Sequence, residues 1–193
     1  KSFDELTKRS KEVKGKIVLF NVPFTKYGET VHYRVNGASE AAKHGAIASL
    51  VRSVGPASMY TPHTGGMKYA DDVKKIPHAA ISLEDAEMLS RQCGLGLKPT
   101  VTLKLEGKFL PDANSRNVIA EIRGSEKPEE IVVFGGHIDS WDVGQGAMDD
   151  GGGCIAAWEA LRVIKQLGLR PKRTLRVCLW TNEENGLMGG KTY

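Results

Sequence analysis

The sequence has few cysteines and no long run of apolar residues. Its three cysteines, Cys93, Cys154 and Cys178, lie far apart and are odd in number. They form neither a CxxC metal motif nor a disulfide framework, so we expect three buried thiols. No stretch approaches the roughly 18 consecutive apolar residues that a membrane-spanning helix needs. We therefore expect no membrane partner.

The sequence also lacks a long block of like charges. It has 27 basic and 23 acidic residues, and its net charge is +4. This balance gives little support to a nucleic-acid partner, and none is expected. What is present is ordinary for a globular protein, with 40% hydrophobic and 26% charged residues. A chain of 193 residues suffices for one ample core or for two modest domains.

The first half of the sequence alternates short apolar runs with one helical pattern and a Gly- and Pro-rich loop. Ser82 stands where it could cap a helix, with Asp85 as a weaker capping-box partner. The predicted elements are a strand at 15–22, a helix from about Ala38 to Gly45, strands at 46–51 and 76–81, and a helix at 83–93. Residues 53–72 are predicted to be loop.

The second half of the sequence has a different pattern, which predicts an α/β sheet. Residues 98–108 alternate Val101, Leu103 and Leu105 with polar neighbours and predict an amphipathic strand. Further strands are predicted at 117–124, 129–136 and 173–181, with a long helix at 151–168. Strand, long crossover helix and strand is the pattern of a parallel sheet. We place a domain boundary near Lys98.

Acidic residues and one histidine follow the strands of this second half. His137 follows the strand that ends at Gly136, Asp149 precedes the long helix, and Glu183 and Glu184 follow the last strand. Ligands gather at the carboxyl ends of strands in open α/β sheets, so these side chains are expected to converge. Imidazole and carboxylate are zinc ligands, and a cation relieves the repulsion among carboxylates. Asp139 is expected to accept the second N–H of the His137 ring.

Other interpretations fit these residues less well. A nucleotide loop fails because Asp149 stands where a third glycine is needed, and acidic residues repel phosphate. A serine hydrolase needs GxSxG, whereas Ser140 lies in IDSWD. Glycoside hydrolysis by two carboxylates leaves His137 without a task. TNEEN, taken alone, reads as a solvated loop, and only its combination with His137 and Asp149 favours a metal site.

Three segments resemble consecutive motifs of the co-catalytic zinc exopeptidases, which include bacterial aminopeptidases and glutamate carboxypeptidases. They are GGHIDS, GAMDDGGG and TNEENGLMGG. The earlier segments KGKIVLFNV, GASEAAKHGAIASLV and IPHAAISLEDAEML resemble a protease-associated (PA) domain. The resemblance implies an α/β fold class, with a mixed α+β PA domain followed by the N-terminal part of a three-layer α/β/α zinc-peptidase domain. We expect residues 1–97 to be the first, truncated at its start, and residues 98–193 the second, truncated at its end.

The resemblance also implies roles for individual residues. His137 would bind one of two Zn²⁺ ions, Asp149 would bridge both, and Glu184 would bind the second. Glu183 would be the general base, and the Asp149–Asp150 peptide bond would be cis. An aspartate and a histidine that complete the site in this family would lie beyond Tyr193, so we expect the chain alone to bind zinc weakly and to be inactive.

The resemblance implies an activity, a partner and a location. The substrate would be a dipeptide or small peptide with free termini, in a secreted or lysosomal setting, and a homodimer is left open. The alternative is a non-catalytic interaction module, because some relatives with this architecture act as receptors. His32, His44, His63 and His78 are expected in surface or structural roles, and Trp158 and Trp180 in the core. Two roles stay open for Trp141, which could line the substrate pocket or serve in packing.

Overall fold

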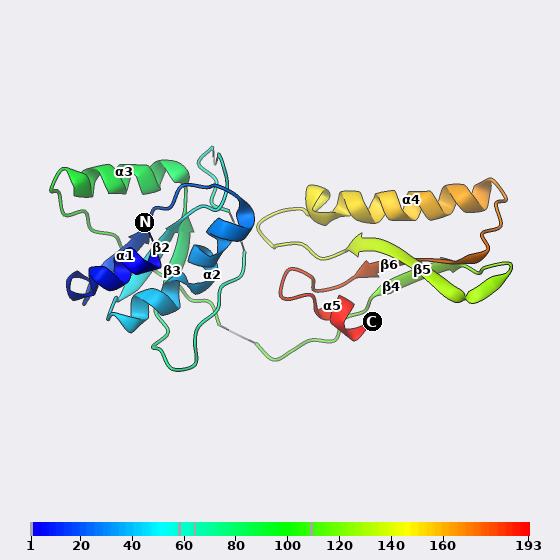
Figure 1. The fold of residues 1–193 in the computed structure, drawn as a ribbon, viewed down its shortest axis with the longest axis horizontal. Helices are drawn as coiled ribbons and strands as arrows, with labels where there is room; N and C mark the ends of the chain where they lie inside the picture. The colour runs from blue at the N-terminus through cyan, green and yellow to red at the C-terminus, as the bar shows by residue number, and fades with distance from the viewer. Residues whose placement is uncertain (1, 58, 64, 109) are drawn as a thin grey trace. The chain divides into compact units, whose positions relative to one another are not determined.

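The structure is a computed structural model that describes residues 2–57, 59–63, 65–108 and 110–193 (Figure 1). It divides into two compact units, Lys1–Phe109 and Leu110–Tyr193. Within the described residues, no helix is both long and apolar enough to cross a membrane. The domain boundary that we placed near Lys98 stays a prediction.

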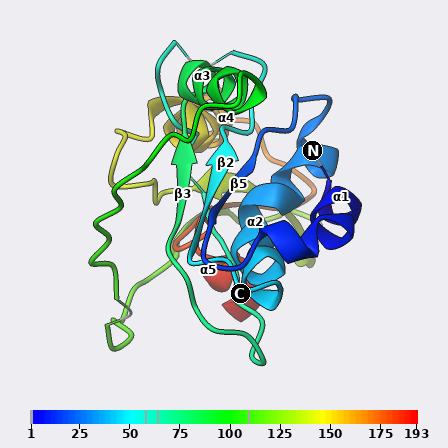
Figure 2. The same ribbon diagram turned by 90° about the vertical axis from the view of Figure 1, so that its left-hand side faces the viewer.

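The first unit is built on a three-stranded parallel sheet in the order β1-β2-β3. Figure 2 shows β2 and β3 side by side, with α2 next to them. Its elements are α1 (Phe3–Lys8), the short turn η1 (Ser10–Glu12), β1 (Ile17–Phe20), α2 (Tyr27–Lys43), β2 (Ala48–Arg52), β3 (His78–Ile81) and α3 (Leu83–Gly94). The three predicted strands and the predicted second helix are confirmed. Ser82 caps α3 by accepting the Asp85 backbone N–H at 3.1 Å.

Helix α2 begins much earlier than the predicted start at Ala38. Five of its six buried residues recur at helical spacing, so one face points into the core throughout: Thr30, Arg34, Gly37, Ala38 and Ala41. The first part of that face carries a hydroxyl and a guanidinium in place of apolar groups. Hydrophobic periodicity therefore indicated only the alanine-rich second part.

The strand predicted at 98–108 is wrong. The described residues of this segment form no strand, and Leu105 is 52% exposed. Alternating residues form a strand only where a neighbour accepts and donates the backbone hydrogen bonds, and no strand of the described chain pairs with this segment. In the loop predicted at 53–72, Ser58 and Thr64 lie outside the described residues.

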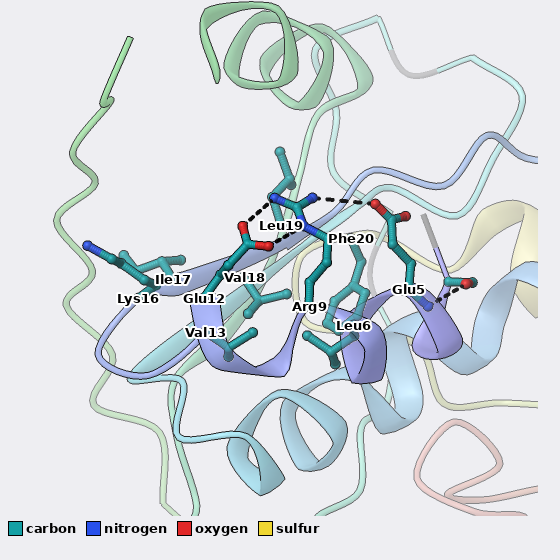
Figure 3. A pocket seen from close by; sticks show the side chains of 11 residues that line it. Glu5, Leu6, Arg9, Glu12, Val13, Lys16, Ile17, Val18, Leu19 and Phe20 are labelled. Atoms are coloured by element: carbon teal, nitrogen blue, oxygen red, sulfur yellow. Dashed lines mark hydrogen bonds and ion pairs between the residues drawn. The ribbon is translucent and has the colours of Figure 1, made fainter. Parts of the chain in front are cut away.

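A hollow of about 230 Å³ lies between the helical N-terminal segment and β1 (Figure 3). Arg9 spans its rim, donating to Glu12 Oε2 at 2.8 Å and to Glu5 Oε1 at 3.4 Å. Leu6, Val13 and Phe20 form its apolar floor and belong to the core of this unit. The cation beside this hollow is thus held by two carboxylates of its own segment.

The second unit is a three-stranded mixed sheet in the order β4-β6-β5. Its elements are β4 (Val118–Ile122), β5 (Lys127–His137), the turn η2 (Ala147–Gly151), α4 (Gly152–Gln166), β6 (Arg173–Trp180) and α5 (Met188–Thr192). β5 and β6 pair in parallel and α4 connects them, as the sequence predicted, whereas β4 pairs with β6 in antiparallel. The connection between β5 and β6 therefore brings their carboxyl ends to the same edge.

Helix α4 packs along one face of this sheet, and α5 lies on the other (Figure 1). Ala157 and Leu161 contact Val177, with Phe134, Leu175 and Leu179 around them. Trp158, which we expected in the core, is 58% exposed because it lies outside this stripe of the helix. Trp180 is half-buried. Burial of the apolar stripe fixes the position of α4, and with it the position of Asp149 and Asp150 before its first turn.

The three thiols differ in their exposure. Cys154 and Cys178 are buried, as expected, but Cys93 is exposed near the end of α3. Ala86 is the buried residue of α3, whereas Cys93 stands next to the last residue of the helix, Gly94. Burial raises the pKa of both the Cys154 and the Cys178 thiol.

Candidate metal centre

The ends of β5 and β6 place the histidine and two glutamates at one edge of the sheet. His137 is the last residue of β5 and pairs in register with Trp180, the last residue of β6. Glu183 and Glu184 follow three and four residues later, after Asn182 has adopted a left-handed backbone angle (φ 54°). This turn folds the two glutamates back towards His137, whose Nε2 lies 3.8 Å from Glu183 Oε2.

Asp150 ties the start of α4 to the end of β5. Its Oδ2 accepts the His137 backbone N–H at 3.2 Å, and its Oδ1 accepts the Gly153 N–H at 3.1 Å. A Cβ at Gly136 would lie 2.3 Å from Asp150 Oδ2, so only glycine permits this approach. The Asp149–Asp150 peptide bond is cis, as expected from the resemblance. Asp149 Oδ1 lies 3.0 Å from His137 Nε2.

The imidazole of His137 lies between two acceptors. Its Nδ1 is 2.9 Å from the backbone carbonyl of Asp139, and its Nε2 is 3.0 Å from Asp149 Oδ1. Burial opposes protonation, but these two hydrogen bonds and the charges of Glu183 and Asp139 outweigh it and raise the pKa of His137. In the neutral ring, Nδ1–H donates to the carbonyl, so Nε2 carries the lone pair towards Asp149.

His137, Asp149 and Glu184 offer ligand atoms that all lie within 4.8 Å of one another. Burial raises the pKa of Glu184, and the charges of Asp149 and Glu183 raise it further, against the opposing effects of His137 and a hydrogen bond from Trp141. One imidazole nitrogen and two carboxylates are the donors that zinc takes, and a cation among them would relieve this repulsion. The residues present therefore fit the zinc that the sequence led us to expect.

Asp139 holds the loop that carries both glutamates. Its two carboxylate oxygens accept the backbone N–H groups of Glu183 at 2.9 Å and Glu184 at 3.2 Å. From the sequence we predicted that the Asp139 carboxylate accepts a hydrogen bond from the His137 ring. In the structure His137 Nδ1 is 3.6 Å from Asp139 Oδ1 but 2.9 Å from the Asp139 backbone carbonyl, which is therefore its partner. The carboxylate thus orients the glutamates, and the backbone of the same residue orients the histidine.

Two positioning residues were missed by sequence reasoning. Asn117, next to the first residue of β4, accepts the Thr181 N–H at 3.0 Å and donates to the Gly189 carbonyl at 2.9 Å, so it holds both ends of the glutamate loop. Asp150 was named only as the partner in the cis bond. In the sequence, Asn117 and Asp150 are each a polar residue directly beside an apolar element. That pattern is too common to identify a positioning residue.

The histidines expected in surface or structural roles lie in the first unit. His78 is buried between Ser49 Oγ at 2.8 Å and the Arg34 carbonyl at 3.1 Å. His63 contacts Arg34, and His32 stacks near Tyr33. None of them joins the group of His137, Asp149 and Glu184.

Two family models match the chain. The PA domain matches residues 2–89, and peptidase family M28 matches residues 117–193. Carboxypeptidase Q of Xenopus laevis is 62% identical over 192 residues, which cover all of this chain and 41% of that protein. The human carboxypeptidase Q is 58% identical over the same length and coverage. The chain thus spans about two fifths of the length of these curated relatives.

Solved structures agree with these matches. A peptidase M28 precursor from Shewanella amazonensis SB2B superposes with a TM-score of 0.89 at 40% identity, covering 94% of this chain and 42% of that one. The predicted fold class, a mixed α/β chain with a PA domain followed by a zinc-peptidase fold, is thereby confirmed.

Proposed function

We propose that this chain serves a zinc-dependent exopeptidase, because residues 117–193 match peptidase family M28 and residues 2–89 match the PA domain. The substrate class is a dipeptide or small peptide with free termini, and the setting is secreted or lysosomal. The observation that carries the proposal is the convergence of His137, Asp149 and Glu184 at the carboxyl edge of the sheet. The homodimer considered from the sequence stays a prediction.

The proposed ligands divide between two zinc ions. His137 would hold one through Nε2, Glu184 would hold the other, and Asp149 would contribute to both. Asp149 suits the shared position because its side chain is 78% exposed and its Oδ1 already faces the His137 ring. Zinc, when bound, supplies a Lewis acid that polarises a peptide carbonyl and lowers the pKa of water.

Glu183 is the proposed general base. Its backbone is fixed by Asp139, and its Oε2 lies 3.8 Å from His137 Nε2, so the carboxylate borders the ligand group. A carboxylate in this position can hold a proton from water at Oε2 and release it to a leaving amine. Asp139 acts through Glu183 and Glu184, and is therefore a positioning residue in this proposal.

The donor count limits what the chain does alone. The described residues bring three ligand side chains together, whereas two zinc ions with four ligands each need more, even with one carboxylate shared. We therefore propose weak zinc binding and little turnover for the 193-residue chain. The peptidase activity is assigned to a protein that supplies further ligands.

Equilibrium dialysis against zinc tests the ligand assignment. We expect saturable binding that is lost in Asp149→Ala and kept in Asp142→Ala, which removes a carboxylate from an exposed position of the same loop. Equal loss in both variants, or none in Asp149→Ala, would contradict the assignment. Near-complete occupancy of two tight sites, with rapid dipeptide hydrolysis, would instead refute the limit set by the donor count.

A further inference from the structure

The glutamate loop, residues 181–189, is closed at its base by two backbone hydrogen bonds. It connects β6 to α5 in the second unit (Figure 1). The Gly189 N–H donates to the Thr181 carbonyl at 2.9 Å, and the Met188 N–H donates to the Asn182 carbonyl at 3.0 Å. The first and last residues of the loop therefore lie next to each other.

Two residues of the glutamate loop have a backbone conformation that most side chains disfavour. Asn182 has a φ of 54° and Leu187 has a φ of 64°, and both angles lie in the left-handed region. Asparagine tolerates this region through local hydrogen bonds, and Asn182 Oδ1 accepts from Asn185 Nδ2 at 3.0 Å. Leu187 is 51% exposed, so its side chain adds little packing that would fix its angle. Residues in such conformations persist where surrounding contacts hold them, so the loop needs contacts from outside itself.

Asn117 supplies such contacts at the base of the loop. Its Oδ1 accepts the Thr181 N–H at 3.0 Å, and its Nδ2 donates to the Gly189 carbonyl at 2.9 Å. The orientation of the amide is fixed by these partners, because a backbone N–H can only donate and a carbonyl can only accept. Ser115, two residues earlier, adds a hydrogen bond of 2.7 Å between its Oγ and Thr181 Oγ1. The side chain of Asn117 thus bonds to both ends of the loop at once.

The surroundings of Gly189 show how closely this amide packs on the loop. Gly189 is the buried residue of α5. A Cβ at this position would lie 2.3 Å from the Thr181 carbonyl oxygen and 2.5 Å from Asn117 Oδ1. Both distances are shorter than a carbon atom tolerates, so the position needs glycine. The amide and the two loop ends therefore pack against each other without room for a further side-chain atom.

We propose that Asn117, assisted by Ser115, is a positioning residue that holds the glutamate loop so that Glu184 reaches the metal centre. The ligand atoms of Glu184 and of the other two proposed zinc ligands lie within 4.8 Å of one another. Asp139 fixes the N–H groups of the two glutamates, and Asn117 fixes the base of the same loop. Asn117 is not a zinc ligand and acts through the loop backbone. This inference rests on the proposed zinc site.

Hydrogen exchange of the metal-free chain tests the positioning role without zinc. In Asn117→Ala, the amides of Glu183 and Glu184 should exchange about tenfold faster, because the base of the loop opens more often. The amides of Val177 and Cys178, in the central strand β6, should keep their exchange rates. A merely structural role would accelerate all four amides alike. That result, or unchanged exchange at the two glutamates, would overturn the proposal.

Zinc affinity, measured by competition with a chromogenic chelator, tests the consequence for the metal centre. Asn117→Ala should weaken zinc binding about tenfold, as loss of an outer hydrogen-bond partner does. Asn117→Asp keeps the acceptor for the Thr181 N–H but turns an anionic oxygen towards the Gly189 carbonyl. Its added negative charge alone would strengthen the binding of a cation, whereas the lost hydrogen bond should weaken it about tenfold. Unchanged or tighter zinc binding in Asn117→Asp would overturn the proposal.

Control variants separate this proposal from the proposed zinc site. Asn114→Ala and Asn114→Asp make the same changes at an exposed position of the same segment and should leave exchange and zinc affinity unchanged. Zinc binding that survives in Asp149→Ala would refute the zinc site, and the exchange of the metal-free amides would still decide the role of Asn117. If the Asn117 variants do not fold, Ser115→Ala removes the neighbouring hydrogen bond at an exposed position. It should accelerate exchange at the two glutamates about threefold, and unchanged exchange there would overturn the proposal.

Discussion

At the scale of single residues, the carboxylate of Asp139 controls the loop that carries Glu183 and Glu184. Asn at position 139 can accept one of the two backbone N–H groups but presents its amide nitrogen to the other. We expect Asp139→Asn to weaken zinc binding by about 10- to 100-fold, as loss of an outer hydrogen-bond partner does at metal sites. Competition with a chromogenic chelator measures this. Asp142→Asn is the charge-matched control, and an equal effect there would argue against a positioning role.

His78 links the stability of the first unit to pH. Burial lowers its pKa, against the opposing effects of the hydrogen bond that its ring donates to the Arg34 carbonyl and of the hydrogen bond with Ser49. The folded state therefore binds fewer protons than the unfolded state, so the stabilisation is present above about pH 6.5 and is lost as the pH falls below it. We expect the free energy of unfolding to decrease from pH 7 to pH 5.

Substitution of His78 checks this pH dependence. His78→Gln should reduce the slope and should cost about 1–3 kcal/mol at pH 7, because buried partners lose their hydrogen bonds. Urea unfolding followed by circular dichroism at several pH values measures both effects. His44→Gln, at the end of α2, removes a histidine outside this network. An unchanged slope in His78→Gln would show that other groups cause the pH dependence.

The residue types of the metal centre could be predicted from the sequence, but their hydrogen bonds could not. His137, Asp149 and Glu184 were found because parallel strand ends meet at one edge, a consequence of topology alone. We expected the Asp139 carboxylate to contact the imidazole of His137, but the Asp139 carbonyl does so instead. This difference depends on backbone angles that no sequence pattern encodes. The roles of Asp150 and Asn117 depend on contacts between distant segments for the same reason.

At the scale of elements, α4 determines where the metal centre stands. Leu161 is 7% exposed and packs on Val177, whereas Leu167 at the end of the same helix is 67% exposed. We expect Leu161→Ala to reduce the free energy of unfolding by about 2–5 kcal/mol and Leu167→Ala to change it by less than about 0.5 kcal/mol. Urea unfolding followed by tryptophan fluorescence compares the two. Similar losses in both would mean that α4 is not anchored through this stripe.

Elements with a continuous apolar signal were predicted well, and elements with a polar inner face were not. β2 is buried along most of its length, β6 has a buried centre, and both lie where they were expected. The first part of α2 was missed because its inner face carries Thr30 and Arg34, which hydrophobic periodicity counts as solvent-facing. The prediction for residues 98–108 was wrong for the opposite reason. The segment does alternate apolar and polar residues, but no described strand pairs with it, so it forms no strand.

At the scale of the whole molecule, all three tryptophans lie in the second unit, at positions 141, 158 and 180. Their fluorescence therefore reports the unfolding of the unit that holds the metal centre. Free zinc at 100 times its dissociation constant should add about 2.7 kcal/mol to that unfolding free energy. Hydrogen exchange of the β2 amides in the first unit should not change. Stabilisation that persists in Asp149→Ala would place the zinc elsewhere.

The unequal exposure of the thiols makes covalent labelling informative. Cys93 on α3 is open to an alkylating reagent, whereas Cys154 and Cys178 are covered by the packing of α4 and the sheet and are held as thiols by their raised pKa. A folded chain thus accepts a dye or spin label at one place in the first unit. Alkylation of Cys154 and Cys178 is slower, and its rate reports how often the second unit opens. Mass spectrometry can therefore measure the labelling of both units in one sample.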